Sequence, residues 1–205
     1  MQYTQFQKIM RGFTVFSLAD IRQADPLFYR RRINEWQGKG YLKKIIKGYY
    51  IFSDLQVDEN VLFEIANRIY APSYVSFEMA LAYYGMIPES IYGVTSASTR
   101  KTMNFKTPLG EFSYRTIRPK LYFGFDYLLV SGKYCKIASP EKALLDYVYI
   151  HNEVNSVDDF AQMRIDREIF LKKVNRKKLE SYAVIYGKKS LNKRLKAFWE
   201  YVTHA

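Results

Sequence analysis

The chain has 205 residues, a formal net charge of +12 at pH 7 and 48% hydrophobic residues, with a mean hydropathy of −0.28. That length can build one or two domains with hydrophobic cores. No apolar run approaches the roughly 18 to 20 residues of a membrane-spanning helix, and the N-terminus lacks the charged and apolar sections of a signal peptide. We therefore expect a soluble cytoplasmic protein with no membrane partner.

Metal-ligating and nucleophilic residue types are scarce in the sequence. Cys135 is the single cysteine, so an internal disulfide and a cysteine-based zinc site are excluded. The two histidines, His151 and His204, lie far apart in the sequence. We expect Cys135 to be a buried structural thiol, and we expect neither a metal nor a cofactor.

Positive charge is concentrated at both ends of the chain. Residues 1–55 carry 10 Lys and Arg against 4 Asp and Glu, residues 56–160 carry 10 against 12, and residues 161–205 carry 12 against 4. Basic ends favour acidic partners such as nucleic acids. A membrane surface would also attract them, but the ribbon described below fits a duplex better.

Two short helices are predicted at the N-terminus. Apolar residues recur at helical spacing from Tyr3 to Met10, and Gly12 ends that run. Ser17 can cap a second helix that continues to Ala24.

The next segment predicts a third helix with a basic face. Pro26 after the potential cap Asp25 is a favourable first helical residue. Ile33 and Trp36 are three residues apart and would face inward, which leaves arginines on the opposite side. Gly38 is a favourable place for the helix to end.

Residues 41–53 alternate as a two-stranded ribbon around a turn at Lys47–Gly48. Three helices followed by a ribbon predict a winged helix-turn-helix over residues 1–55, whose third helix enters the major groove of double-stranded DNA. The alternative is an ordinary amphipathic helix and hairpin with solvated arginines. The predicted DNA-binding residues are Tyr29, Arg30, Arg31, Asn34, Lys39, Lys43, Lys44 and Lys47.

Residues 56–205 predict a second, α/β domain, which makes the chain α+β. Helices are expected around Leu62–Ile69 and over 76–86, then strands over 92–98, 101–106, 110–117 and 122–130 in a largely antiparallel sheet. A helix capped by Ser139 follows. Four C-terminal helices are expected over 157–163, 167–174, 177–186 and 191–202.

The C-terminal helices carry a second cluster of cations, which predicts a second basic surface. A solvated helix face is the alternative, because a charge run is often only that. The residues are Lys172, Lys173, Arg176, Lys177, Lys178, Lys188, Lys189, Lys193 and Arg194.

Four carboxylates of the second domain are the candidates for a catalytic set. Glu111, Asp126, Glu141 and Asp146 have no spacing that forces them together, and Glu141 and Asp146 suit a first-turn position and a solvated or capping role. No catalytic residue is therefore predicted. A nucleic-acid-processing enzyme, or a subunit of one, targeted by the winged helix is the alternative function.

Four segments of the second domain together resemble the AbiEi family of abortive-infection antitoxins and transcriptional regulators. They are residues 71–88 (APSYVSFEMALAYYGMIP), 95–101 (TSASTRK), the 107–110 turn (TPLG) and 137–146 (IASPEKALLD). The resemblance implies a repressor that binds inverted repeats in its own operon, with a dimer on DNA as one arrangement. It also implies a type IV antitoxin that opposes a nucleotidyltransferase-like toxin without forming a stable complex with it.

Overall fold

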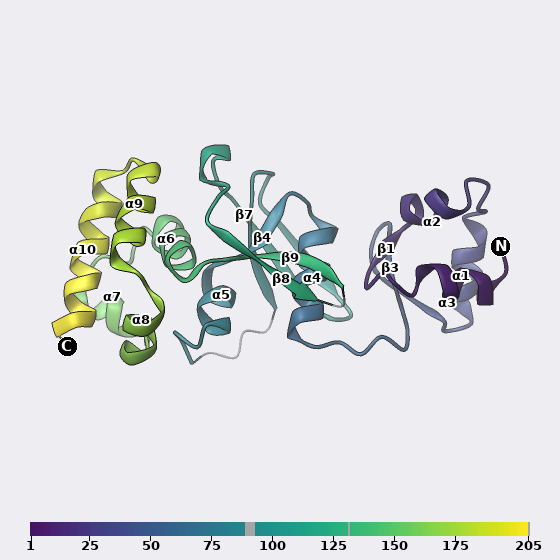
Figure 1. Ribbon diagram of the computed structural model, residues 1–205, viewed down its shortest axis with the longest axis horizontal. Helices are drawn as coiled ribbons and strands as arrows, with labels where there is room; N and C mark the ends of the chain where they lie inside the picture. The colour runs from purple at the N-terminus through teal and green to yellow at the C-terminus, as the bar shows by residue number, and fades with distance from the viewer. Residues whose placement is uncertain (89–92, 131, 205) are drawn as a thin grey trace.

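The computed structural model describes residues 1–88, 93–130 and 132–204. The predicted strand start at Tyr92 and the turn residue Ser131 lie outside these ranges. The described chain forms three parts in a row along its longest axis: a small N-terminal unit, a central sheet with its helices, and a C-terminal group of helices (Figure 1). Among the described helices, none combines the length and apolar character needed to cross a bilayer.

The N-terminal unit contains three helices and an antiparallel sheet in the order β1-β3-β2. Ser17 caps α2 as predicted, in a capping box with Asp20. The turn at Lys47–Gly48 is also where predicted, with Gly48 at φ 90°. The elements are α1 (Tyr3–Met10), β1 (Phe16–Ser17), α2 (Leu18–Ala24), α3 (Arg31–Gly38), β2 (Leu42–Ile46) and β3 (Tyr49–Phe52).

The third helix begins later than predicted. It starts at Arg31 instead of Pro26, and the amide of Phe28 donates to the carbonyl of Asp25 at 2.9 Å in a turn. Phe28 is buried beside Trp36, with ring centroids 5.7 Å apart, whereas Leu27 is 91% exposed. The chain therefore turns to insert Phe28 into the core, and this tertiary contact overrides the local helix-start signal.

Aromatic side chains form the core of the N-terminal unit. The ring of Phe6 lies 4.5 Å from that of Trp36 and 5.5 Å from that of Phe16. Leu42 and Phe52 of the ribbon pack into the same cluster. Aromatic pairs at such separations stabilise a core beyond the area that they bury, which helps such a small unit to hold its helices.

The opposite face of the ribbon belongs to a different core. Ile45 and Ile51, together with Val15, are buried in the large hydrophobic cluster of the central sheet. A 2.5 Å ion pair between Arg68 and Asp20 lies at the same junction. The ribbon is therefore clamped between the two parts of the protein.

The central sheet has six described strands in the order β6-β7-β5-β4-β9-β8. Among them, three pairings are antiparallel and two, β4 with β9 and β5 with β7, are parallel, so the sheet is mixed. The strands are β4 (Ser73–Val75), β5 (Val94–Ser98), β6 (Met103–Thr107), β7 (Gly110–Thr116), β8 (Phe125–Val130) and β9 (Lys133–Ala138), with a 3₁₀ turn η1 (Pro119–Leu121) before β8.

Helices cover both faces of this sheet. Consecutive side chains of β4 show this, because they point to different helices. Ser73 points to α4 (Glu59–Ile69), where its hydroxyl is 3.5 Å from the carbonyl of Ala66. The next residue, Tyr74, points to α6 (Pro140–Ile150) on the other face. Helix α5 (Phe77–Tyr83) packs beside α6.

The C-terminal helices continue outward from α6. They are α7 (Val157–Gln162), α8 (Arg167–Lys173), α9 (Arg176–Tyr186) and α10 (Lys189–His204). Helices α9 and α10 both contact α6. The position of α6 makes it the link between the sheet and the C-terminal end of the molecule (Figure 1).

A buried ion pair on α6 corrects the role expected for Asp146. The ammonium of Lys142 lies 2.5 Å from the Asp146 carboxylate, and neither side chain is exposed. Tyr74 and Ser76 donate to the other carboxylate oxygen at 2.8 Å, and Tyr186 of α9 donates to the first at 2.5 Å. Asp146 is therefore the centre of a structural network, neither solvated nor a cap.

Burial shifts the acid–base properties of this network. Desolvation lowers the pKa of Lys142, and the charge of Asp146 opposes that lowering. Desolvation, reinforced by the Asp146 charge, raises the pKa values of Tyr74 and Tyr186 well above their ordinary value. Both phenols therefore remain donors to the carboxylate at physiological pH. Cys135, buried as expected, has a pKa raised by desolvation to about 11.

We predict that Asp146→Ala lowers the free energy of unfolding by about 3–5 kcal/mol, because it leaves the Lys142 charge buried without its partner. Adding Lys142→Met should recover part of that loss, since no buried charge then remains. Urea denaturation measures both effects. Glu200→Ala on exposed α10 is the control, expected within about 0.5 kcal/mol of wild type; an equally small loss for Asp146→Ala would contradict the role of the network.

Candidate nucleic-acid interface

All eight predicted DNA-binding residues of the N-terminal unit are exposed. Tyr29 and Arg30 lie in the turn before α3, and Arg31 and Asn34 lie on α3 itself. Lys39 follows the end of that helix, Lys43 and Lys44 lie on β2, and Lys47 lies at the turn of the ribbon.

The basic face of α3 is fixed by its apolar face. Ile33 and Trp36 are 1% and 3% exposed, and they anchor the helix in the aromatic core. Arg31 lies 3.8 Å from Glu35, but both side chains are largely in solvent. An exposed pair of this kind contributes about 0–1 kcal/mol, so it leaves Arg31 available to a phosphate.

The ribbon presents two consecutive lysines to solvent. Leu42 inserts into the N-terminal core and Ile45 into the central core, so Lys43 and Lys44 lie between two buried anchors. The pairing of β2 with β3 shifts register between Lys44 and Ile46. Lys43 and Lys44 precede this irregularity and pair regularly with Ile51 and Tyr50, so they project from opposite faces of the ribbon.

The predicted set leaves out four further exposed cations of this unit. They are Lys8 on α1, Arg11 just after it, Arg22 on α2 and Arg32 on α3. The run of three arginines at 30–32 was a usable signal. Only Ile33 in the first turn of the helix is buried, so all three arginine side chains could be expected to lie in solvent. The exposed cations of the unit therefore occur on all three of its helices or beside them and continue to the ribbon.

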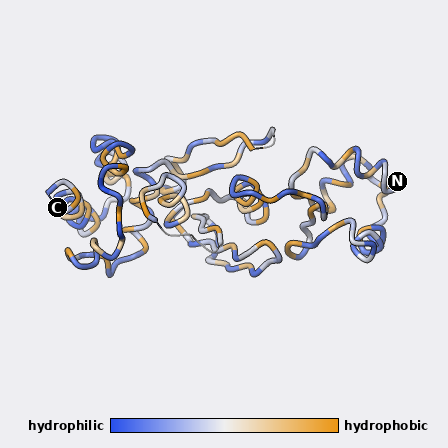
Figure 2. Tube along the Cα trace, turned by 90° about the horizontal axis from the view of Figure 1, so that it is seen from below, coloured by the Kyte–Doolittle hydropathy of each residue, from blue (hydrophilic) through white to orange (hydrophobic). Residues whose placement is uncertain are grey.

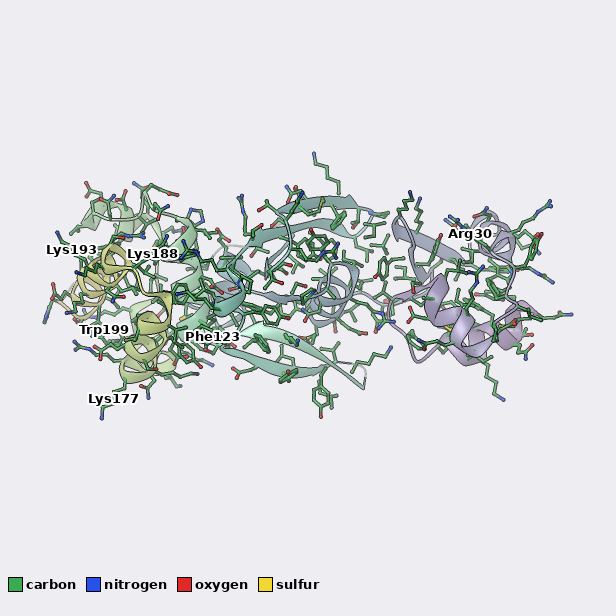
Figure 3. The ribbon with its side chains drawn as sticks, turned by 90° about the horizontal axis from the view of Figure 1, so that it is seen from above. Arg30, Phe123, Lys177, Lys188, Lys193 and Trp199 are labelled. Carbon is green, nitrogen blue, oxygen red and sulfur yellow. The ribbon has the colours of Figure 1, made fainter. Side chains whose placement is uncertain are left out.

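The second basic set lies at the opposite end of the molecule. Lys177, Lys188 and Lys193 surround the C-terminal helices, whereas Arg30 lies at the N-terminal end (Figure 3). Lys172, Lys173 and Lys189 are also exposed. The two sets are not parts of one continuous surface.

Some members of the second set are committed to contacts within the protein. Lys178 forms a 2.9 Å ion pair with the buried carboxylate of Glu141, and the Lys188 ammonium lies 4.4 Å from the centre of the Tyr149 ring. Arg176 pairs with Glu180 at 2.9 Å. These contacts reduce the number of cations in the set that are free for a partner.

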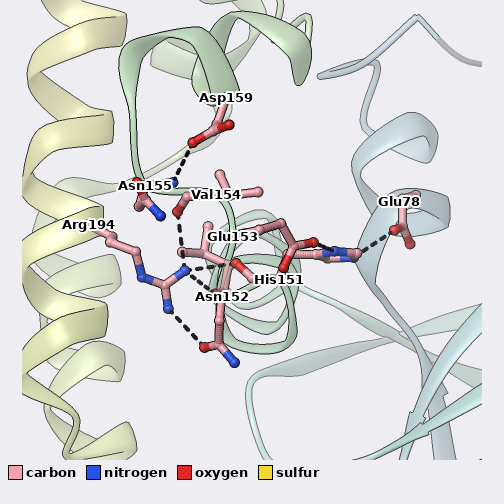
Figure 4. A network of polar contacts seen from close by, with 9 residues as sticks. Glu78, His151, Asn152, Glu153, Val154, Asn155, Asp159 and Arg194 are labelled. Carbon is pink, nitrogen blue, oxygen red and sulfur yellow. Dashed lines mark hydrogen bonds and ion pairs between the residues drawn. The ribbon is translucent and has the colours of Figure 1, made fainter.

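Arg194 is the most firmly committed residue of the second set. Its guanidinium donates to the carbonyls of Val148 and His151 at 2.8 Å and to that of Val154 at 3.2 Å (Figure 4). Carbonyls at the end of a helix lack intrahelical partners. Arg194 therefore fastens α10 to the end of α6, which is a structural role.

The same loop carries a histidine between two carboxylates. His151 lies 3.2 Å from Glu78 of α5 and 2.7 Å from Glu153 (Figure 4). The hydrogen bond with Glu78 raises the pKa of His151, which burial opposes and Glu153 reinforces. For Glu78, burial acts to raise the pKa, but the His151 contact and a backbone hydrogen bond outweigh it and the pKa falls. Both shifts favour an imidazolium held between carboxylates.

Three of the four candidate carboxylates have separate partners, and Asp126 is exposed on β8. Glu111 accepts from Asn104 at 2.9 Å, and Glu141 accepts from the amide of Asn175 at 2.9 Å in addition to its pair with Lys178. Asp146 is enclosed in the α6 network. Within residues 1–88, 93–130 and 132–204, no group of three His, Cys, Asp or Glu side chains is placed to hold a metal ion.

We predict that the contribution of His151 to stability depends on pH. A raised folded-state pKa means that the contribution is complete below the unfolded pKa of about 6.5 and is lost as pH rises through the folded value. The difference in unfolding free energy between wild type and His151→Gln should therefore shrink from mildly acidic to alkaline pH in urea titrations. His204→Gln, on the exposed last turn of α10, is the control, and a pH-independent His151 difference would show that no charge is involved.

In comparisons with known proteins, no family model and no curated protein matches the chain. Neither comparison bears on the AbiEi resemblance.

Proposed function

We propose that the protein is a DNA-binding transcriptional repressor whose residues 1–55 act as a winged helix-turn-helix. Helix α3 would enter the major groove, α2 would cross the backbone, and the β2–β3 ribbon would be the wing. The order α1-β1-α2-α3-β2-β3 supports this assignment. The observation that carries it is the set of exposed cations on α3 and β2 over a rigid aromatic core.

The chemistry of these side chains fits a duplex. Arginine can pair with two acceptors of guanine, asparagine with adenine, and either can bind phosphate. Lys43, Lys44 and Lys47 lie on a ribbon that two cores hold in place, so their positions are set before DNA binds. Preorganisation lowers the entropic cost of binding.

We further propose that the protein represses its own operon and acts as a type IV antitoxin in the cytoplasm. Support for this comes from the AbiEi-like segments, of which 137–146 contains both Lys142 and Asp146 of the buried network. The toxin would be a nucleotidyltransferase-like protein whose effect is opposed without a stable complex. In this proposal the protein is a regulator and not an enzyme.

The DNA-binding proposal predicts that Arg30→Ala with Arg31→Ala abolishes specific binding to the DNA upstream of the gene. Each lost phosphate contact should also reduce the slope of log affinity against log salt by about 0.9. Fluorescence anisotropy at several salt concentrations measures both. Lys106→Ala with Arg118→Ala removes two exposed cations outside the N-terminal unit and is the charge-matched control; unchanged binding by the Arg30 and Arg31 variant would overturn the assignment.

The second basic surface predicts a dependence on DNA length. Changing Lys172, Lys173, Lys177, Lys189 and Lys193 to Gln should weaken binding to the long upstream duplex and spare binding to a short duplex with one half-site. The reason is that these residues lie on α8, α9 and α10, at the opposite end of the molecule from α3 (Figure 1). Arg194 is left intact because it fastens α10. If this variant binds both duplexes with wild-type affinity and antitoxin activity is unchanged, the face is a solvated one.

A further inference from the structure

An apolar patch lies on the outer face of the β8–β9 hairpin. Tyr127, Leu129 and Tyr134 are 60%, 65% and 70% exposed. Leu129 pairs with Tyr134 across the hairpin, and the Tyr127 and Tyr134 rings lie 6.2 Å apart. The opposite face is buried through residues such as Val130 and Cys135. Because the outer face of a sheet is ordinarily polar, this patch indicates a surface that another protein covers.

The patch adjoins an unprotected sheet edge. β8 is the last strand of the sheet, and its sequence FDYLLV carries a single charge, Asp126. Proteins usually protect such edges with lysine, proline or a covering element. The other edge strand, β6, has Lys106 and contacts the β2 strand of the ribbon.

The hairpin extends beyond the body of the sheet. It packs on α4, and at its tip the Lys133 ammonium lies 3.8 Å from the centre of the Phe13 ring, but the outer edge of β8 pairs with no described strand. β9 pairs with β4 at a single position, Val75 with Ile137. Nearer the tip, the side chain of Asn67 replaces a strand and bonds both the amide and the carbonyl of Lys136. In Figure 2 the hairpin stands out along the upper flank of the chain.

We propose that β8 pairs with β8 of a second copy of this chain, so that the two central sheets join edge to edge in an antiparallel dimer. In a register centred on Leu128, Tyr127 of each copy faces Leu129 of the other. Asp126 then faces the uncharged Val130. Every exposed apolar side chain of β8 gains an apolar neighbour, and no like charges oppose each other.

The positive charge of the chain restricts where a second copy can bind, and β8 is one of the few suitable surfaces. Copies that each carry +12 repel one another, so self-association needs a surface with few cations. β8 has none, and Lys136, the β9 partner of Tyr127, donates to the Tyr122 hydroxyl at 3.2 Å. An antiparallel edge contact uses the same strand from both copies, which is the closed two-fold arrangement of most soluble dimers. Two N-terminal units would then be available to an inverted repeat, although the dimer does not depend on DNA binding.

The oligomeric state of the full chain without DNA tests the proposal. Light scattering during size-exclusion chromatography should give a dimer for wild type and a monomer for Leu129→Glu and for Tyr127→Glu. Val184→Glu adds the same charge on α9 at a site that is 73% exposed, and it should remain dimeric. Circular dichroism confirms that each variant is folded. A monomeric wild type, a dimeric Leu129→Glu, or dissociation by Val184→Glu would overturn the proposal.

Disulfide trapping tests the register. Directly opposed residues of antiparallel strands have Cα atoms about 4.5–5.5 Å apart, within the range that a disulfide spans. Mixed Tyr127→Cys and Leu129→Cys proteins should therefore cross-link with each other under oxidation, and neither should cross-link efficiently with itself. Equal cross-linking of one variant with itself would overturn the register centred on Leu128.

Discussion

The buried pair of Lys142 and Asp146 is the constraint on which the larger part of the structure depends. A charge without water is tolerated only with a close partner and complete hydrogen bonding. Here the partners come from three places: Tyr74 from the sheet, Lys142 and Asp146 from α6, and Tyr186 from α9. If one of these elements moved away, a buried charged group would lose one of its partners. The network thus specifies how the C-terminal helices sit on the sheet.

The sequence predicted the elements whose signals are local. Amphipathic periodicity located the helices, and Ser17 and Ser139 cap helices as expected. It missed β4 and β9 because β4 has only three residues and the parallel pairing of Val75 with Ile137 links distant segments. It misplaced the start of α3 because the burial of Phe28 is a tertiary effect.

The same distinction applies to the candidate site. Exposed cations on α3 were predictable, because Ile33 and Trp36 define the opposite face. The commitment of Arg194 to carbonyls at the end of α6 was not, since those carbonyls are more than forty positions away for two of its bonds. For Asp146 a signal existed: Lys142 stands four residues earlier on the same helix face, and a lysine and an aspartate at that spacing between apolar residues indicate an internal pair.

The ribbon described above has a consequence for how this protein can be divided. Its two faces serve two different cores, through Leu42 and Phe52 on one side and Ile45 and Ile51 on the other. A cut after residue 55 would therefore leave an apolar surface in water, where it would promote association. The N-terminal unit is therefore not a domain that could be exchanged independently. Its contacts with the central sheet set the orientation in which it meets a partner.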